Sequence, residues 1–313
     1  MFLSQLRPHT LQAFGMFGGS RISVNTFLAL NGHSKTLTKL DLHSIAASSM
    51  EYLSAMQDCT NLISLKMAEN IRGTQNLAEK HPDVFQQLIE WLSQCKKLRF
   101  LEITNFVNGP EFLASVLREP QIKLEKFGLE GYQLVDAKDF HQALGLQTSL
   151  RSLFLNGVDS EYLMDNQTLV ECLSGLVNLR DLRLTGIAAS FSEQHIATLA
   201  QRLPKLEEFW TGGWHITDGI WDHLKDLKFL RKLELNADTR FTDKGIQDFV
   251  TSLDGESNAG FSLYIMMQDT DCNISDDEQD NIRRTMVTRL GGRFEFQLVR
   301  APEEDDYSDS GSD

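Results

Sequence analysis

The chain has 313 residues, of which 41% are hydrophobic, and it carries a formal charge of −14 at pH 7. This apolar content is enough for a substantial core, and no run approaches the roughly 18 apolar residues of a membrane-spanning helix, so we expect no membrane partner. The acidic charge weighs against a nucleic-acid partner, because a phosphate-binding surface needs clustered lysine and arginine.

The first residues, MFLSQLRPHTL, lack the apolar stretch and cleavage site of a secretory signal. The four cysteines show no close CxxC pair and no framework spacing. Both features favour a reduced, intracellular compartment, and we expect a cytoplasmic or nuclear protein.

An L-x-x-L-x-L pattern recurs along the chain from residue 11. Successive copies begin 24 to 30 residues apart, except for one interval of 36 residues that indicates an insertion near residues 71–83. This spacing is typical of leucine-rich repeats. The copies are LQAFGM (11–16), LTKLDL (37–42), LISLKM (62–67), LRFLEI (98–103), LEKFGL (124–129), LRSLFL (150–155), LRDLRL (179–184), LEEFWT (206–211), LRKLEL (230–235) and GFSLYI (260–265).

The segments between the strands have helical periodicity, as in VECLSGL (170–176) and HIATLAQRL (195–203). One unit cannot cover its own apolar face, so neighbouring units must stack on a shared core. We therefore predict an α/β leucine-rich-repeat solenoid of about ten repeats over residues 1–300. Its parallel sheet lies on the concave side and its helices lie on the convex side.

The end of the chain should close the solenoid and then become disordered. ISDDEQD (274–280) predicts a helix start with Ser275 as its cap, and FEFQLV (294–299) predicts a closing strand beside the tenth copy. Residues 301–313 are too acidic to fold alone, since the last eleven residues contain six acids and no base. This tail is either a solubilising terminus or a substrate for an acid-directed kinase at Ser310.

Repeat phase predicts a structural role for Cys59 and Cys95. Each lies three residues before the first leucine of the next copy, in a slot that leucine fills elsewhere. A cysteine in such a slot behaves as a small buried hydrophobe, and we prefer this interpretation over a metal or redox role.

The same phase separates two tryptophans of the segment LEEFWTGGWHITDGI (206–220). Side chains alternate along a strand, so Trp210, at position five, should point to the concave side. Trp214 is at position nine, where other copies place mostly apolar residues, and we expect it in the core. The equivalent residues are Ile45, Phe106, Tyr132, Val158 and Ile187.

The candidate binding site lies at position five of three consecutive strands. Phe154, Arg183 and Trp210 should form one patch, because neighbouring strands lie about 4.8 Å apart. Aromatic residues and arginine are enriched at the energetic centres of protein interfaces. We predict a protein client here, with Phe100 and Tyr264 at the flanks. In the alternative, these aromatics only cover one another or a neighbouring loop.

A second row of charged residues occupies position two of the repeats. Its alternating signs predict cross-strand ion pairs on a solvated rim, each contributing about 0–1 kcal/mol. The row consists of Arg99, Glu125, Arg151, Arg180, Glu207 and Arg231.

Motifs of enzymes are absent from the sequence. It contains no Walker loop, no GxGxxG after a strand, no GxSxG elbow and no HExxH. We therefore predict a protein that is not an enzyme and has no cofactor, no catalytic residues and no metal site.

Two turns carry a resemblance to a known family. WHITDGIWDHL (214–224) and RFTDKGIQDFV (240–250) resemble the I-T-D-x-G-L turn of cysteine-containing leucine-rich repeats, the type found in F-box proteins. The resemblance implies that Thr217 and Thr242 cap the following helices and that Gly245 is the family glycine, whereas Gly219 comes one residue early. It also implies that ubiquitin-ligase subunits are partners, although we find no helical F-box-like segment before the first repeat.

Two other families combine leucine-rich repeats with an acidic tail. Ran GTPase-activating proteins favour asparagine at position nine, which only Asn70 provides among the clear copies, and their catalytic arginine matches no motif of this chain. Histone-binding proteins of this kind have shorter repeats. We keep the first as an alternative function and the second as a weaker one.

Overall fold

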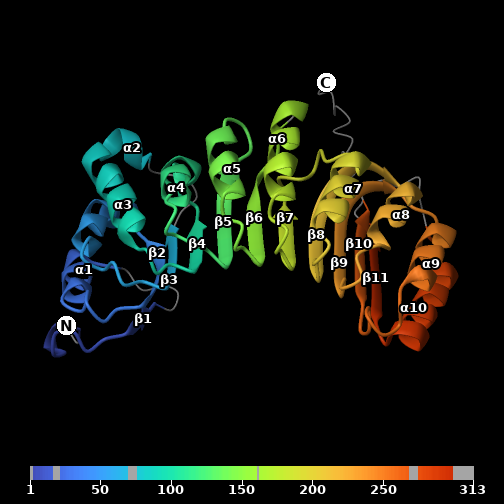
Figure 1. Ribbon diagram of the computed structural model, residues 1–313, viewed down its shortest axis with the longest axis horizontal. Helices are drawn as coiled ribbons and strands as arrows, with labels where there is room; N and C mark the ends of the chain where they lie inside the picture. The colour runs from blue at the N-terminus through green and yellow to red at the C-terminus, as the bar shows by residue number, and fades with distance from the viewer. Residues whose placement is uncertain (1–2, 17–21, 70–75, 161, 268–273, 299–313) are drawn as a thin grey trace, which may run out of the picture.

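The structure is a computed structural model, which describes residues 3–16, 22–69, 76–160, 162–267 and 274–298. These residues form a parallel sheet of 11 strands in sequence order. The strands follow one another from the N-terminal to the C-terminal end of the molecule, and the helices lie along their outer side (Figure 1). This arrangement is a leucine-rich-repeat solenoid, as the repeat spacing predicts.

Each repeat contributes one strand, and the strand bounds follow the L-x-x-L-x-L copies. The strands are β1 (Ala13–Gly15), β2 (Lys39–Ile45), β3 (Ser64–Glu69), β4 (Phe100–Thr104), β5 (Lys126–Gln133), β6 (Ser152–Val158), β7 (Asp181–Thr185), β8 (Glu208–Thr217), β9 (Lys232–Arg240), β10 (Ser262–Met267) and β11 (Arg293–Leu298).

The return segments are α-helices, except where short 3-10 helices replace or precede them. The α-helices are α1 (Val24–Asn31), α2 (Leu77–Lys80), α3 (Pro82–Gln94), α4 (Gly109–Leu117), α5 (Lys138–Gly145), α6 (Leu163–Ser174), α7 (Glu193–Arg202), α8 (Trp221–Leu224), α9 (Asp243–Ser252) and α10 (Asp276–Leu290); the 3-10 helices are η1 (Leu3–Gln5), η2 (Ala47–Met56) and η3 (Asp218–Ile220).

One continuous apolar core runs through all the repeats. The leucine slots pair in register from strand to strand, so that Leu101, Phe127 and Leu153 are neighbours and all three are fully buried. Cys59 and Cys95 are also fully buried, as predicted from their slots. Burial raises the pKa of both thiols to about 12, so they stay protonated and behave as apolar side chains.

The two family-like turns cap their helices as the resemblance implies. The side chain of Thr242 accepts a hydrogen bond from the Gly245 backbone N–H at 3.0 Å, and that of Thr217 accepts one from the Gly219 N–H at 3.3 Å. Because Gly219 comes one residue early, Thr217 caps the 3-10 helix η3, whereas Thr242 caps the α-helix α9.

Each of these turns is also bound by an acidic residue of the preceding repeat. Asp218 accepts hydrogen bonds from the backbone N–H (3.1 Å) and the hydroxyl (2.6 Å) of Thr242, and from Nε1 of the buried Trp221 at 3.1 Å. Glu193 accepts from the Thr217 hydroxyl in the same way, at 2.8 Å. These contacts link the helix starts of neighbouring repeats.

The expectation that Trp214 is buried is wrong, since 57% of its surface is exposed. The register between β8 and β9 shifts between Gly213 and Ile216, where two residues of β8 lie opposite Asp238 alone. Such a bulge turns the following side chains to the opposite face. Ile216 therefore enters the core in place of Trp214, and it is 1% exposed.

Val158, another residue at position nine, is also exposed, at 63%. Gly157 pairs with Tyr132, and a Cβ atom there would overlap the Tyr132 carbonyl oxygen and crowd Ile187. Gly157 thus occupies the inward position between these two buried side chains, and Val158 points outward.

The C-terminal end of the solenoid closes as predicted. Ser275 and Glu278 form a reciprocal capping box at the start of α10, and β11 pairs in parallel with β10. Asn70, Cys272, Ser310 and the acidic tail lie outside the described residues, so the boundary at residue 300 stays a prediction. Within the part of the chain that is described, no helix combines the length and apolar character needed to cross a membrane.

Candidate functional site

Three of the predicted binding residues lie side by side on the concave face of the sheet. Phe154 on β6 is the register partner of Arg183 on β7, which in turn is the partner of Trp210 on β8. All three side chains are partly exposed. We call Phe154, Arg183 and Trp210 the concave patch.

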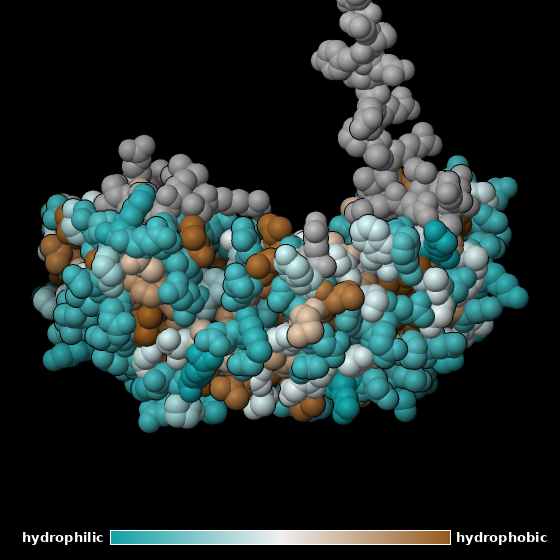
Figure 2. All heavy atoms as spheres, turned by 90° about the horizontal axis from the view of Figure 1, so that it is seen from above, coloured by the Kyte–Doolittle hydropathy of each residue, from teal (hydrophilic) through white to brown (hydrophobic). Residues whose placement is uncertain are grey.

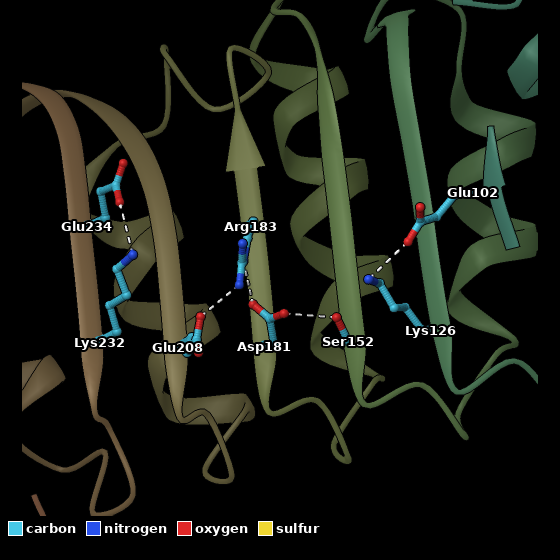
Figure 3. Close-up of polar contacts among 8 residues, drawn as sticks. All are labelled: Glu102, Lys126, Ser152, Asp181, Arg183, Glu208, Lys232 and Glu234. Atoms are coloured by element: carbon cyan, nitrogen blue, oxygen red, sulfur yellow. Dashed lines mark hydrogen bonds and ion pairs between the residues drawn. The ribbon is translucent and has the colours of Figure 1, made fainter. Parts of the chain in front are cut away.

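Arg183 is held in place by two carboxylates. Its Nε donates to Asp181 at 2.9 Å and its Nη2 donates to Glu208 at 2.8 Å, while the hydroxyl of Ser152 donates to Asp181 at 2.9 Å (Figure 3). Partial burial works to lower the pKa of Arg183, but the hydrogen bonds and charges of the two acids outweigh it and raise that pKa. The guanidinium group therefore stays charged and fixed at the centre of the concave patch.

The indole of Trp210 lies between two cations. The guanidinium carbon of Arg183 is 4.4 Å from the centre of the ring system, and Nζ of Lys232, from β9, is 4.0 Å from it. A cation within about 6 Å of an aromatic face is attracted to its negative quadrupole. The indole Nε1 is buried and has no hydrogen-bond partner among the described residues. The ring is thus preorganised on the surface rather than packed into the core.

Phe154 lies beside a glycine of the neighbouring strand. Gly128 holds position five of β5, and a Cβ atom there would contact the side chains of Glu102 and Phe154 at 3.2 and 3.9 Å. Beyond it, Glu102 accepts from Lys66 at 2.6 Å and from Lys126 at 2.9 Å. Partial burial works to raise the pKa of Glu102, but these two lysines outweigh it and lower that pKa.

The predicted flanking residues lie farther away. Phe100 is 40% exposed, but it occupies position three of β4, and β5 separates it from β6. Tyr264 lies on β10, beyond Glu234 of β9, and its hydroxyl donates to Gln297 at 2.7 Å. Burial raises the pKa of Glu234, and this outweighs the opposite effects of Lys232 and Arg183.

The sequence therefore predicts that Phe154, Arg183 and Trp210 are adjacent, but it does not predict the hydrogen bonds and cation–ring contacts that hold their side chains in place. Lys232 and Glu208 are not among the predicted site residues. The repeat phase could have identified both, because they occupy position three of neighbouring strands in register. Their contacts depend on rotamers that repeat phase does not specify.

The concave face provides charged and aromatic surface. In the described ranges, no set of three or more histidine, cysteine, aspartate or glutamate side chains could hold a metal ion. Seen from above, the side on which α4 to α6 lie in Figure 1, hydrophobic residues form separate groups in a mostly hydrophilic surface (Figure 2). At the start of α6, Tyr162, Leu163 and Met164 are all exposed.

Comparisons with known proteins add little to this description. No family model matches the chain, and no curated protein matches it. One matching solved structure is described as the crystal structure of a TLR13–ssRNA13 complex; it is 16% identical, has a TM-score of 0.46, and matches over 86% of this chain. The chain covers 40% of the length of that protein, and a likeness at this level transfers no function.

Proposed function

We propose that this protein is a non-enzymatic scaffold that holds a protein client on its concave face. The observation that carries the proposal is the indole of Trp210, fixed between Arg183 and Lys232 at the middle of a rigid parallel sheet. Tryptophan and arginine are the residue types enriched at interface hot spots. A side chain that is already ordered loses little conformational entropy on binding, which favours affinity.

The charges on the concave face favour a protein over a polyanion. Lys126 and Arg183 each have a carboxylate within 3 Å, at 2.9 and 2.8 Å respectively. Because each cation is accompanied by an acid, a strand of phosphates would meet repulsion as well as attraction. A protein surface can present both signs and match this pattern.

We further propose that the scaffold acts as the substrate receptor of an F-box type ubiquitin ligase in the cytoplasm or nucleus. The support is the pair of capped turns at Thr217 and Thr242, which resemble those of cysteine-containing leucine-rich repeats. Buried Cys59 and Cys95 are consistent with that repeat type and with a reducing compartment. On this proposal, the client bound at the concave patch is the protein that becomes ubiquitinated.

The test is affinity capture with the full chain as bait, followed by mass spectrometry. The double variant Phe154→Ala with Trp210→Ala should lose the client, because both rings leave the concave patch. Its thermal stability should change by less than about 1 kcal/mol, as expected for surface substitutions. Recovery of ligase subunits with the parent chain is the additional outcome expected for the substrate-receptor role.

A matched control removes two exposed aromatic rings elsewhere, in Tyr162→Ala with Trp214→Ala. This control should capture the same client as the parent chain. If the control loses the client and the concave double variant keeps it, the concave face is not the binding surface. Recovery of a small GTPase without ligase subunits would instead support the Ran GTPase-activating-protein alternative.

A further inference from the structure

The residues at position two of the repeats form a continuous row along one rim of the sheet. Each lies directly before its strand, and backbone hydrogen bonds of 2.7 or 2.8 Å join each to the preceding member. The row is therefore as regular as the strands that follow it. We call these residues the rim row: Arg99, Glu125, Arg151, Arg180, Glu207 and Arg231.

The ion pairing predicted for the rim row is found at one place only. Arg180 donates to Glu207 at 2.9 Å. Between the other described members of the row no ion pair forms, and the side chains of Arg151 and Arg231 have no partner among the described residues. Both side chains are exposed. The rim row therefore presents positive charge that the protein itself leaves uncompensated.

Lysines that lie two residues before members of the rim row add to this charge. Lys97 donates to the amide oxygen of Asn61 at 2.8 Å, and Lys205 donates to that of Asn178 at 2.7 Å. An amide accepts a hydrogen bond without neutralising the ammonium group. Lys123 is exposed and has no partner among the described residues. The rim is thus strongly basic, although the chain as a whole carries −14.

The centre of the rim is hollowed into a groove of about 320 Å³. Arg151, Arg180 and Lys205 supply its cations, and Ser149 and Asn178 supply polar groups between them. Glu125 is the one acid of this lining. The groove gives the basic rim a defined place in which an acidic chain can lie.

We propose that this rim binds an acidic peptide segment of a partner protein in extended conformation. From β4 to β9 the rim row spans five strand spacings of about 4.8 Å, or about 24 Å, which an extended peptide covers with about seven residues. This surface is separate from the concave patch and does not depend on it.

Glu125 and Glu207 favour a peptide over a nucleic acid as the ligand of the rim row. Glu125 lies between Arg99 and Arg151 in the row, so a ligand that crosses the rim must pass a negative charge. An extended peptide can turn the acidic side chain nearest Glu125 away from the rim, because successive side chains point to opposite sides, whereas a nucleic-acid strand carries a phosphate in its backbone at every step. The alternation of the row therefore fits an acidic peptide better than a nucleic acid.

The experiment measures fluorescence anisotropy of a labelled octaglutamate peptide titrated with the full chain at low salt. The peptide should bind with an affinity that falls as salt rises, and octaglutamine should not bind. The double variant Arg151→Gln with Arg231→Gln should bind octaglutamate between about twofold and thirtyfold more weakly, as expected for the loss of two exposed ion pairs.

The matched control is Lys80→Gln with Lys244→Gln, which removes two exposed cations from α2 and α9. It should bind octaglutamate as the parent chain does, and so should the Phe154→Ala, Trp210→Ala variant. Equal weakening by the rim variant and the lysine control would show that only net charge matters and would overturn the proposal. Tighter binding of a labelled octathymidylate than of octaglutamate would overturn the choice of a peptide.

Discussion

Replacing Gly245 by alanine should destabilise the protein, although helix propensity alone predicts the reverse. Gly245 lies in the first turn of α9, where exchange of glycine for alanine is worth up to about 1 kcal/mol in favour of the helix. A Cβ atom at this position would, however, overlap the carboxylate of Asp218 from the preceding repeat. The Asp218 side chain would have to move.

The cost follows from the contacts that Asp218 would lose. It accepts hydrogen bonds from the backbone and hydroxyl of Thr242 and from the indole of Trp221, which is 4% exposed. A hydrogen bond to a charged acceptor contributes about 1.5–3 kcal/mol, less where solvent reaches it. Solvent reaches Thr242 and part of Asp218, so these bonds contribute less than that range, and the shifted carboxylate loses them only in part. After the gain in helix propensity, we expect a net destabilisation of about 1–3 kcal/mol.

The assay is urea unfolding followed by circular dichroism, on Gly245→Ala, Asp218→Ala and the double variant. Gly175→Ala is the control, because a Cβ atom at the end of α6 would come no closer than 3.5 Å to a neighbouring atom. This control should be neutral or slightly stabilising. In the Asp218→Ala background, Gly245→Ala should cost less than about 0.5 kcal/mol, because the obstructing carboxylate is gone.

Additive effects of Gly245→Ala and Asp218→Ala would refute this reasoning. They would mean that the glycine is needed for its backbone freedom and not to admit the acid of the neighbouring repeat. Comparison of the two single variants with the double variant therefore tests whether the family-like turn links neighbouring repeats or only caps its own helix.

Two further predictions concern the core. Ile216→Ala should lower the free energy of unfolding by about 2–5 kcal/mol, and Trp214→Ala should lower it by less than about 1 kcal/mol, because the β8 bulge buries Ile216 and leaves Trp214 exposed. Urea unfolding measures both values. A larger loss for Trp214→Ala than for Ile216→Ala would contradict the bulge. His141 is 1% exposed, and burial lowers its pKa to about 4, so its contribution to stability is complete above its unfolded pKa of about 6.5 and is lost as pH falls from there towards 4. Between pH 7 and pH 4.5 the parent should therefore lose about 2–3 kcal/mol more than His141→Gln, and equal losses would contradict the burial of a neutral imidazole.

The sequence is sufficient to predict the solenoid, because the fold depends on a repeated apolar pattern. Each leucine slot that the pattern assigns to the interior is buried from Leu37 to Leu235. The same phase places Phe154, Arg183 and Trp210 on adjacent strands, since parallel pairing in register follows from stacked equal units. What repeats in the sequence is therefore predictable in the structure.

The failures occur where a repeat departs from the common length. Counting from the strand predicts that Trp214 and Val158 both lie in the core, but Trp214 lies within the β8 bulge, and Val158 follows Gly157, which takes the inward position opposite Tyr132. A change of one residue is enough to expose such a side chain, because side chains alternate with a period of two. The glycines beside them, Gly213 and Gly157, were the available signal, since glycine within a strand often marks a bulge or a close approach.

The concave patch and the rim row lie on the same parallel sheet, so their positions relative to each other are fixed. Arg180 of the rim row and Arg183 of the concave patch are three residues apart near the start of β7, which places them about 10 Å apart. A partner whose folded surface contacts Trp210 could lay an adjoining acidic segment along the rim without rearrangement of the sheet. Linking two weak contacts in one partner raises the effective concentration of the second contact, so the combined affinity exceeds that of either alone. Because exposed ion pairs contribute little by themselves, we expect the rim to select among clients that already fit the concave patch.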